Sequence, residues 1–168
     1  SPLHPYIVQA FAKENFEPEQ LPVLEASVVE MYLRILLEDD AQLDELQVCE
    51  LERWHEMHLP LPEGLGASHV TIGGIMDRLD RVTHDGRRLW RIVDYKTGGD
   101  PETADSVAQL FEVRGGKHRH YMLKTFIYAE ILRRELAPDA SSIAPALYFV
   151  HRARGKDGFS PYLKMGKG

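Results

Sequence analysis

The clearest pattern in the chain is a pair of alternating apolar runs at residues 69–82 and 88–96, which flank a short polar segment. Alternation with a period of two is typical of β-strands, and the dipeptide Asp85-Gly86 between the runs favours a two-residue hairpin turn. A turn centred on this dipeptide pairs residues whose numbers sum to 171. The register therefore predicts that Asp77 lies opposite Asp94 on one face of the hairpin, together with Lys96.

The spacing of apolar residues in the rest of the chain, with its glycines and prolines, predicts seven further elements. They are a helix over residues 24–38, a strand over 46–54, a loop at 59–66, a short helix at 107–111, a helix over 117–135, a strand over 143–151 and an edge strand over 159–165. The strands at 88–96 and 143–151 are expected to be parallel and joined by a right-handed crossover. With the order of the other elements, this indicates an α/β (α+β) fold, with a mixed sheet flanked by helices. The long connection over residues 97–116 is expected to be a flap that contacts the substrate.

Charge is distributed unevenly along the chain. The net charge is −6, yet residues 1–63 hold 14 acids and 3 bases, whereas residues 64–168 hold 12 acids and 17 bases. The part with the hairpin is therefore basic, which is compatible with a nucleic-acid-binding face. The only cysteine, Cys49, is expected to be a buried apolar side chain, and a cytoplasmic protein without an intrachain disulfide is the default. No apolar run is long enough to predict a membrane span.

The predicted Asp77–Asp94 pair is the strongest candidate for chemistry. Like charges that face each other destabilise a sheet unless something offsets them, and a divalent cation between carboxylates does so. The alternative is that these are ordinary solvated surface residues. Other catalytic patterns are absent from the sequence: it has no P-loop, no zinc-protease helix and no Gly-x-Ser-x-Gly elbow.

Residues 74–78 (GIMDR) and 94–98 (DYKTG) resemble the two motifs of the PD-(D/E)XK nuclease superfamily, in its RecB/AddB-like branch. The resemblance implies a single domain over residues 1–168 with a restriction-endonuclease-like αβββαβ core. It implies a Mg²⁺- or Mn²⁺-dependent DNA nuclease, with an exonuclease expected. Asp77, Asp94 and the Tyr95 backbone carbonyl would bind the metal, and Asp77, Asp94 and Lys96 would be catalytic. It further implies DNA recombination or repair, with a helicase region or subunit as partner.

The helix predicted over residues 117–135 places Lys117, Tyr121, Lys124 and Tyr128 on one face, with His120 beside them. A solvated polar face with two half-buried tyrosines is the alternative. The resemblance matches Tyr128 to a family tyrosine, but Lys124 stands where the family usually has glutamine. We expect Lys117, His120, Lys124 and Tyr128 to bind the DNA substrate, with lysine contacting phosphate.

The sequence departs from the resembled branch in its upstream part. That branch carries a metal-binding histidine on an earlier helix; His4 is the candidate by default, although Pro5 disfavours a helix at position 4. Glu52 could approach the metal but is more simply a solvated strand residue. Since the chain begins at Ser1 without methionine, we expect a domain cut from a longer protein, with the histidine helix outside it. The alternative function is a catalytically inactive DNA-binding or scaffolding module of a helicase–nuclease complex.

Overall fold

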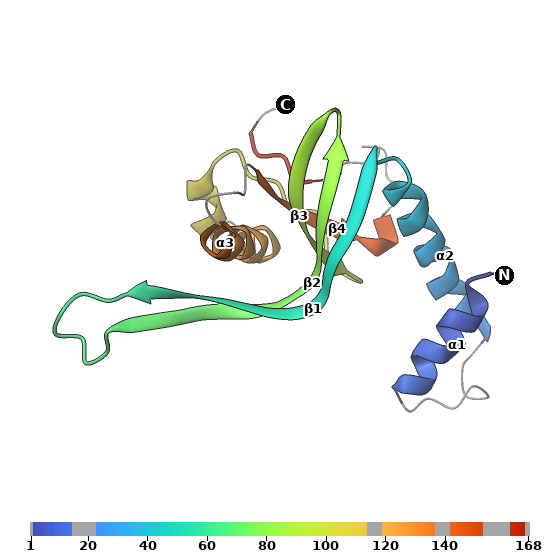
Figure 1. Cartoon of the computed structure of the whole chain (residues 1–168), viewed down its shortest axis with the longest axis horizontal. Helices are drawn as coiled ribbons and strands as arrows, with labels where there is room; N and C mark the ends of the chain where they lie inside the picture. The colour runs from blue at the N-terminus through green and yellow to red at the C-terminus, as the bar shows by residue number, and fades with distance from the viewer. Residues whose placement is uncertain (1, 15–22, 114–118, 137–141, 153–161, 167–168) are drawn as a thin grey trace. The chain divides into compact units, whose positions relative to one another are not determined.

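The computed structural model describes residues 2–14, 23–113, 119–136, 142–152 and 162–166 (Figure 1). The chain divides into two compact units, a smaller one of residues 1–42 and 150–159 and a larger one of residues 43–149 and 160–168. The larger unit holds the whole sheet and the helix that packs on it, so it contains both sequence motifs.

The smaller unit consists of helix α1 (His4–Lys13), helix α2 (Val23–Asp40) and the short 3₁₀ helix η3 (Val150–Arg152). Helix α2 confirms the helix predicted over residues 24–38. The expectation that Pro5 keeps His4 out of a helix is wrong, because α1 begins at His4. Proline is tolerated there because a backbone N–H in the first turn has no partner within the helix.

The larger unit is built on a four-stranded sheet in the order β1-β2-β3-β4. Strands β1 (Glu45–Pro60), β2 (His69–His84) and β3 (Arg87–Lys96) are antiparallel neighbours, and β4 (Ile143–Phe149) runs parallel to β3. The crossover from β3 to β4 contains the 3₁₀ helix η2 (Val107–Phe111) and helix α3 (His120–Glu135). This mixed sheet with helix α3 packed on it confirms the predicted fold class (Figure 1).

The β2–β3 turn has the backbone that its sequence predicts. Asp85 and Gly86 both have positive φ, at 49° and 70°, as a type I′ turn requires. The register runs from His84 opposite Arg87 to Arg78 opposite Val93, so paired numbers sum to 171 throughout. The turn residues therefore determine which side chains face each other along the whole hairpin.

The main core lies between the sheet and α3. Leu79 and Ile92 point from β2 and β3 toward Ile131 and Leu132 of the helix, and all four side chains are buried. Burying such side chains contributes about 1.5–3 kcal/mol each relative to exposure. A second cluster around Leu110 and Met122 packs beside it, so α3 is held against the sheet along its length.

Strands β1 and β2 are longer than predicted and bend within their length. They continue past the sheet as a two-stranded arm that includes Pro60, where a loop was predicted (Figure 1). Proline is tolerated because β1 is an edge strand of the sheet. At the bend, Glu52 has φ of 50°, and the ladder lacks a pair between Leu51–Arg78 and Arg53–Met76. By register, the residue of β2 at this gap is Asp77.

Two smaller predictions need correction. Residues 162–166 do not form an edge strand, although the Leu163 N–H donates to the Pro145 carbonyl at 2.8 Å; residues 159–161 lie outside the described ranges. Cys49 is exposed rather than buried, because this part of the edge strand β1 is exposed on both faces. None of the described helices combines the length and the apolar character needed to cross a membrane.

Candidate functional site

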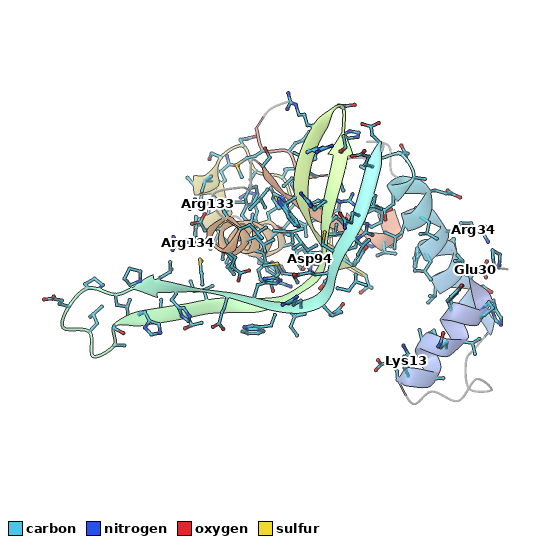
Figure 2. The ribbon with its side chains drawn as sticks, in the orientation of Figure 1. Lys13, Glu30, Arg34, Asp94, Arg133 and Arg134 are labelled. Carbon is cyan, nitrogen blue, oxygen red and sulfur yellow. The ribbon has the colours of Figure 1, made fainter. Side chains whose placement is uncertain are left out.

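Asp77 and Asp94 meet where the β2–β3 ladder ends. The register that pairs Arg78 with Val93 places them opposite each other one step further on, on the face that α3 covers. Asp77 Oδ2 accepts the backbone N–H of Tyr95 at 2.8 Å. Asp94 is 1% exposed, and Figure 2 labels it close to the junction between the sheet and the arm. The predicted juxtaposition of the two carboxylates is thus present in the fold.

Two lysines approach the buried Asp94 carboxylate from different elements. Lys96, two residues further along β3, forms an ion pair with Oδ2, and Lys124 of α3 donates to Oδ1 at 3.0 Å. Burial by itself would lower the pKa of Lys124, but the hydrogen bond and charge of Asp94, helped by Tyr128 and Asp77, raise it. Asp94 therefore sits between two ammonium groups, which offset the cost of burying its charge.

The predicted face of α3 lies against this site. The Tyr121 ring lies 5.0 Å from Lys96 Nζ, and the Tyr128 ring lies 5.2 Å from Lys124 Nζ. Each lysine thus rests on an aromatic face, a favourable arrangement for a cation. Lys124 and Tyr128 are where the prediction placed them, while Lys117 lies outside the described residues. His120 is largely exposed, its ring is tilted by 51° to that of Tyr121 with 4.0 Å between centroids, and its Nδ1 lies 3.8 Å from Glu102 Oε1.

Gly74, the first residue of the first motif, leaves room for Tyr128. The Tyr128 hydroxyl donates to the Ile75 carbonyl at 3.1 Å. A Cβ atom at position 74 would overlap that hydroxyl and lie 3.1 Å from two ring carbons. The glycine therefore lets the tyrosine fasten α3 to β2, next to Lys124.

We expect Gly74→Ala to lower the free energy of unfolding by about 1–3 kcal/mol, because the added methyl group forces Tyr128 from its position. Gly98→Ala is the matched control, since a Cβ atom there meets nothing within 4 Å. Chemical denaturation of both variants measures the difference. Equal stability of the two variants would contradict the proposed close packing of Tyr128 on Gly74.

The connection between β3 and α3 is packed rather than a free flap, at least over residues 99–113. Glu102 accepts the N–H of Met122 at 2.9 Å and so caps the first turn of α3, where an acidic group is favoured. Arg119 donates to the Gln109 carbonyl at 2.9 Å and to the Thr103 carbonyl. Sequence reasoning missed Glu102, whose only signal is an acid shortly before a helix. These contacts anchor the connection to the start of α3 beside Tyr121, and its contact with the substrate stays a prediction.

The opposite face of the hairpin carries a buried charge network that the sequence analysis also missed. Asp80 is fully buried and accepts from Arg78 and Arg91, each at 2.7 Å. Arg78 also donates to the Tyr95 hydroxyl at 3.0 Å. Arg78 therefore points away from Asp77, as predicted, and its structural role is to hold β2 and β3 together behind the carboxylates.

The donor atoms at the site suit a hard divalent cation. Asp77 and Asp94 offer carboxylate oxygens, the ligands that Mg²⁺ and Mn²⁺ prefer. The N–H and C=O of one residue in a strand point to the same side, so the Tyr95 carbonyl faces β2, as its N–H does. No third His, Cys, Asp or Glu side chain completes a metal-binding group within the described ranges. Glu52 is exposed at the bend, and water would supply the remaining ligands.

Comparison with known protein families matches residues 5–162 to the PD-(D/E)XK nuclease superfamily. A search of curated proteins finds no match to the chain. The matched range includes both motifs, all four strands and helix α3, and the superfamily is one of metal-dependent nucleases. Because the match extends over most of the sequence and contains the whole mixed sheet, the chain belongs to the PD-(D/E)XK nuclease superfamily.

Proposed function

We propose that this chain hydrolyses phosphodiester bonds in DNA with Mg²⁺ or Mn²⁺ and belongs to the RecB/AddB-like branch of its superfamily. The observation that carries the proposal is the meeting of Asp77, Asp94 and Lys96 on one face of the β2–β3 hairpin. Family membership supports the reaction class. DNA as the substrate is supported by the two motifs and by the excess of bases in residues 64–168.

Each residue of the site has a distinct part in this proposal. Asp77, Asp94 and the Tyr95 carbonyl would hold the ion, which supplies Lewis-acid activation of the phosphate and a more acidic water. Lys96, kept beside Asp94 and the Tyr121 ring, would stabilise the negative charge that builds up on the scissile phosphate. Lys124 would contact a phosphate oxygen as a point charge. Tyr128, whose ring lies beside Lys124 Nζ and whose hydroxyl donates to β2, would hold this part of α3 in place.

The wider setting is proposed from the motif resemblance. We place the domain in DNA recombination or repair in the cytoplasm, as an exonuclease joined to a helicase region or subunit. Lys117 and His120 would extend the contact with DNA. A linear duplex and a closed circular duplex of the same sequence distinguish the modes of action, because only an endonuclease cleaves the circle.

A catalytically inactive DNA-binding or scaffolding module is the second candidate. The observation in its favour is that both carboxylate oxygens of Asp94 contact lysines, while the described residues offer no third acidic or histidine side chain at the site. Incubation of linear DNA with the protein in Mg²⁺, Mn²⁺ or EDTA separates the two. Cleavage that requires the metal supports the nuclease, whereas DNA binding without cleavage in any metal supports the inactive module.

We expect Lys124→Gln to raise the affinity for Mn²⁺ about fivefold, because it removes a positive charge that contacts Asp94 Oδ1; unit charges about 4 Å apart interact by about 1 kcal/mol even in water. Titration calorimetry measures the affinity. If Lys124 also contacts phosphate, the salt slope of DNA binding falls by about one.

The control for this substitution is Arg87→Gln. It removes the same charge from the other end of β3, about 23 Å away at 3.3 Å per residue and beyond the screening length. An Mn²⁺ affinity that is the same in both variants would show that Lys124 does not compete with the metal.

A further inference from the structure

A hollow of about 430 Å³ lies at the turn end of the sheet, away from the carboxylates. Its polar lining comes from three strands and consists of Glu45, Gln47, Arg81, Thr83, Arg88 and Trp90. Cross-strand pairing joins Arg81 to Trp90, Thr83 to Arg88 and Gln47 to Arg81. The side chains therefore belong to one face and form a single surface.

This is the same face that carries Asp77 and Asp94. Alternation along β3 leads from Asp94 through Ile92 to Trp90 and Arg88, and Ile92 lies beneath α3. Trp90 is four residues from Asp94, about 13 Å along the strand, which is about the rise of four base pairs of duplex DNA. The hollow and the carboxylates thus flank the core beneath α3 at a distance that one nucleic-acid molecule spans.

The two arginines of the hollow differ from most arginines of the chain in their partners. Most other described arginines contact acids, and Arg119 contacts carbonyls; those paired with acids are Arg34, Arg53, Arg78, Arg91, Arg133 and Arg134, while Arg87, on the opposite face, is exposed like the two arginines of the hollow. Within the ranges that the structure describes, Arg81 and Arg88 form no ion pair, and both are exposed. Two such guanidinium groups in one hollow are suited to an external anion.

The other polar groups of the hollow favour a nucleic acid. The Arg81 guanidinium lies over the Trp90 ring, 5.1 Å from its centroid, which limits its motion and presents a flat cationic surface. The one acid, Glu45, accepts a hydrogen bond from Thr83 Oγ1 at 2.8 Å, so two positive charges face one negative charge. Guanidinium planes both bind phosphate and stack on bases.

We propose that this hollow binds the backbone of the nucleic-acid substrate at a point remote from the bond that is cleaved, with Arg81 and Arg88 contacting phosphates. The proposal rests on the proposed nuclease function, since it assigns the far part of the same substrate to this surface. Binding energy gained there would hold the strand along the side of α3, which covers the face between the two points, and position the scissile phosphate near Asp94.

The test compares Arg81→Gln/Arg88→Gln with Arg87→Gln, in EDTA so that no cleavage occurs. Arg87 pairs with His84 and so points to the opposite face of the same hairpin. Binding is measured over a range of salt with single strands of about 16 nucleotides and about 2 nucleotides; the short strand, at about 3.4 Å per step, is shorter than the roughly 13 Å between Trp90 and Asp94. The double variant is expected to lose about tenfold in affinity for the long strand and about 1.4 in salt slope, since a single strand contributes about 0.7 per phosphate contact. Binding of the short strand, which cannot reach both sites, is expected to change less than that of the long one.

Other outcomes overturn the proposal. If the double variant binds the long strand as Arg87→Gln does, the hollow is not a nucleic-acid site, while metal-dependent cleavage by the wild-type protein would still support the proposed function. If polyglutamate occupies the hollow and DNA binding is unchanged in the double variant, the surface recognises an acidic protein segment. If the wild-type protein binds no nucleic acid, both proposals fail. Thermal melting shows that the variants are folded.

Discussion

Asp94→Asn is expected to reduce metal-dependent DNA cleavage about 10³-fold or more, the loss typical when a group that stabilises the transition state is removed. Asparagine keeps the shape of the side chain and one carbonyl oxygen for Lys96 or Lys124, but it removes the negative charge that would hold the cation. Asp77→Asn is expected to have a similar effect, because its carboxylate faces the same point. Single-turnover cleavage of an end-labelled duplex in Mg²⁺ measures both.

The matched control for this prediction is Asp85→Asn. It removes one carboxylate from the exposed turn of the same hairpin, and asparagine suits the positive φ of that position. Its cleavage rate is expected to remain near that of the wild-type protein. If Asp94→Asn, still folded by melting, cleaves DNA at the wild-type rate, then the carboxylate does not hold a catalytic metal.

Lys96→Met is expected to reduce the cleavage rate about 10²–10³-fold by removing the positive charge nearest the reacting phosphate. Methionine keeps the unbranched apolar stem that rests near Tyr121, so the local packing is retained. The affinity for Mn²⁺, measured by calorimetry, is expected to be unchanged or higher, because an ammonium group that pairs with Asp94 is gone.

The combination of these two measurements identifies the role of Lys96. A lower rate with unchanged or tighter metal binding fits a residue that acts on the phosphate. A lower rate explained entirely by weaker metal binding would instead make Lys96 a residue that organises Asp94. Lys96→Arg is expected to restore little of the rate, since a planar guanidinium does not replace a compact ammonium group.

Local sequence signals predicted the hairpin and its carboxylates correctly because the determinants are close in the chain. The Asp85-Gly86 turn sets the register, and the period of two then carries Asp77 and Asp94 to one face. The helical period likewise placed Lys124 and Tyr128 on one side of α3. The partner of Lys124 was not foreseen: the structure pairs it with Asp94, whereas the sequence analysis assigned it a phosphate.

The features that sequence reasoning missed depend on contacts between distant segments. Glu102 caps α3 from another segment, 20 residues before Met122. Aspartate is usually exposed, but Asp80 is buried because Arg78 and Arg91 surround it in the folded sheet. The arm was not predicted because Pro60 favours a loop. An edge strand tolerates proline, but only the strand order shows that β1 lies at the edge of the sheet.

The packing of Tyr128 on Gly74 couples the changes that these two positions can undergo over time. A side chain at position 74 meets the ring while Tyr128 is present, so that step alone is harmful. Loss of the ring first costs the hydrogen bond to the Ile75 carbonyl and some packing, after which alanine at position 74 is no longer opposed. Because the Tyr128 ring is buried, its removal costs about 3–5 kcal/mol, so both orders of change pass through a destabilised protein and the two positions constrain each other.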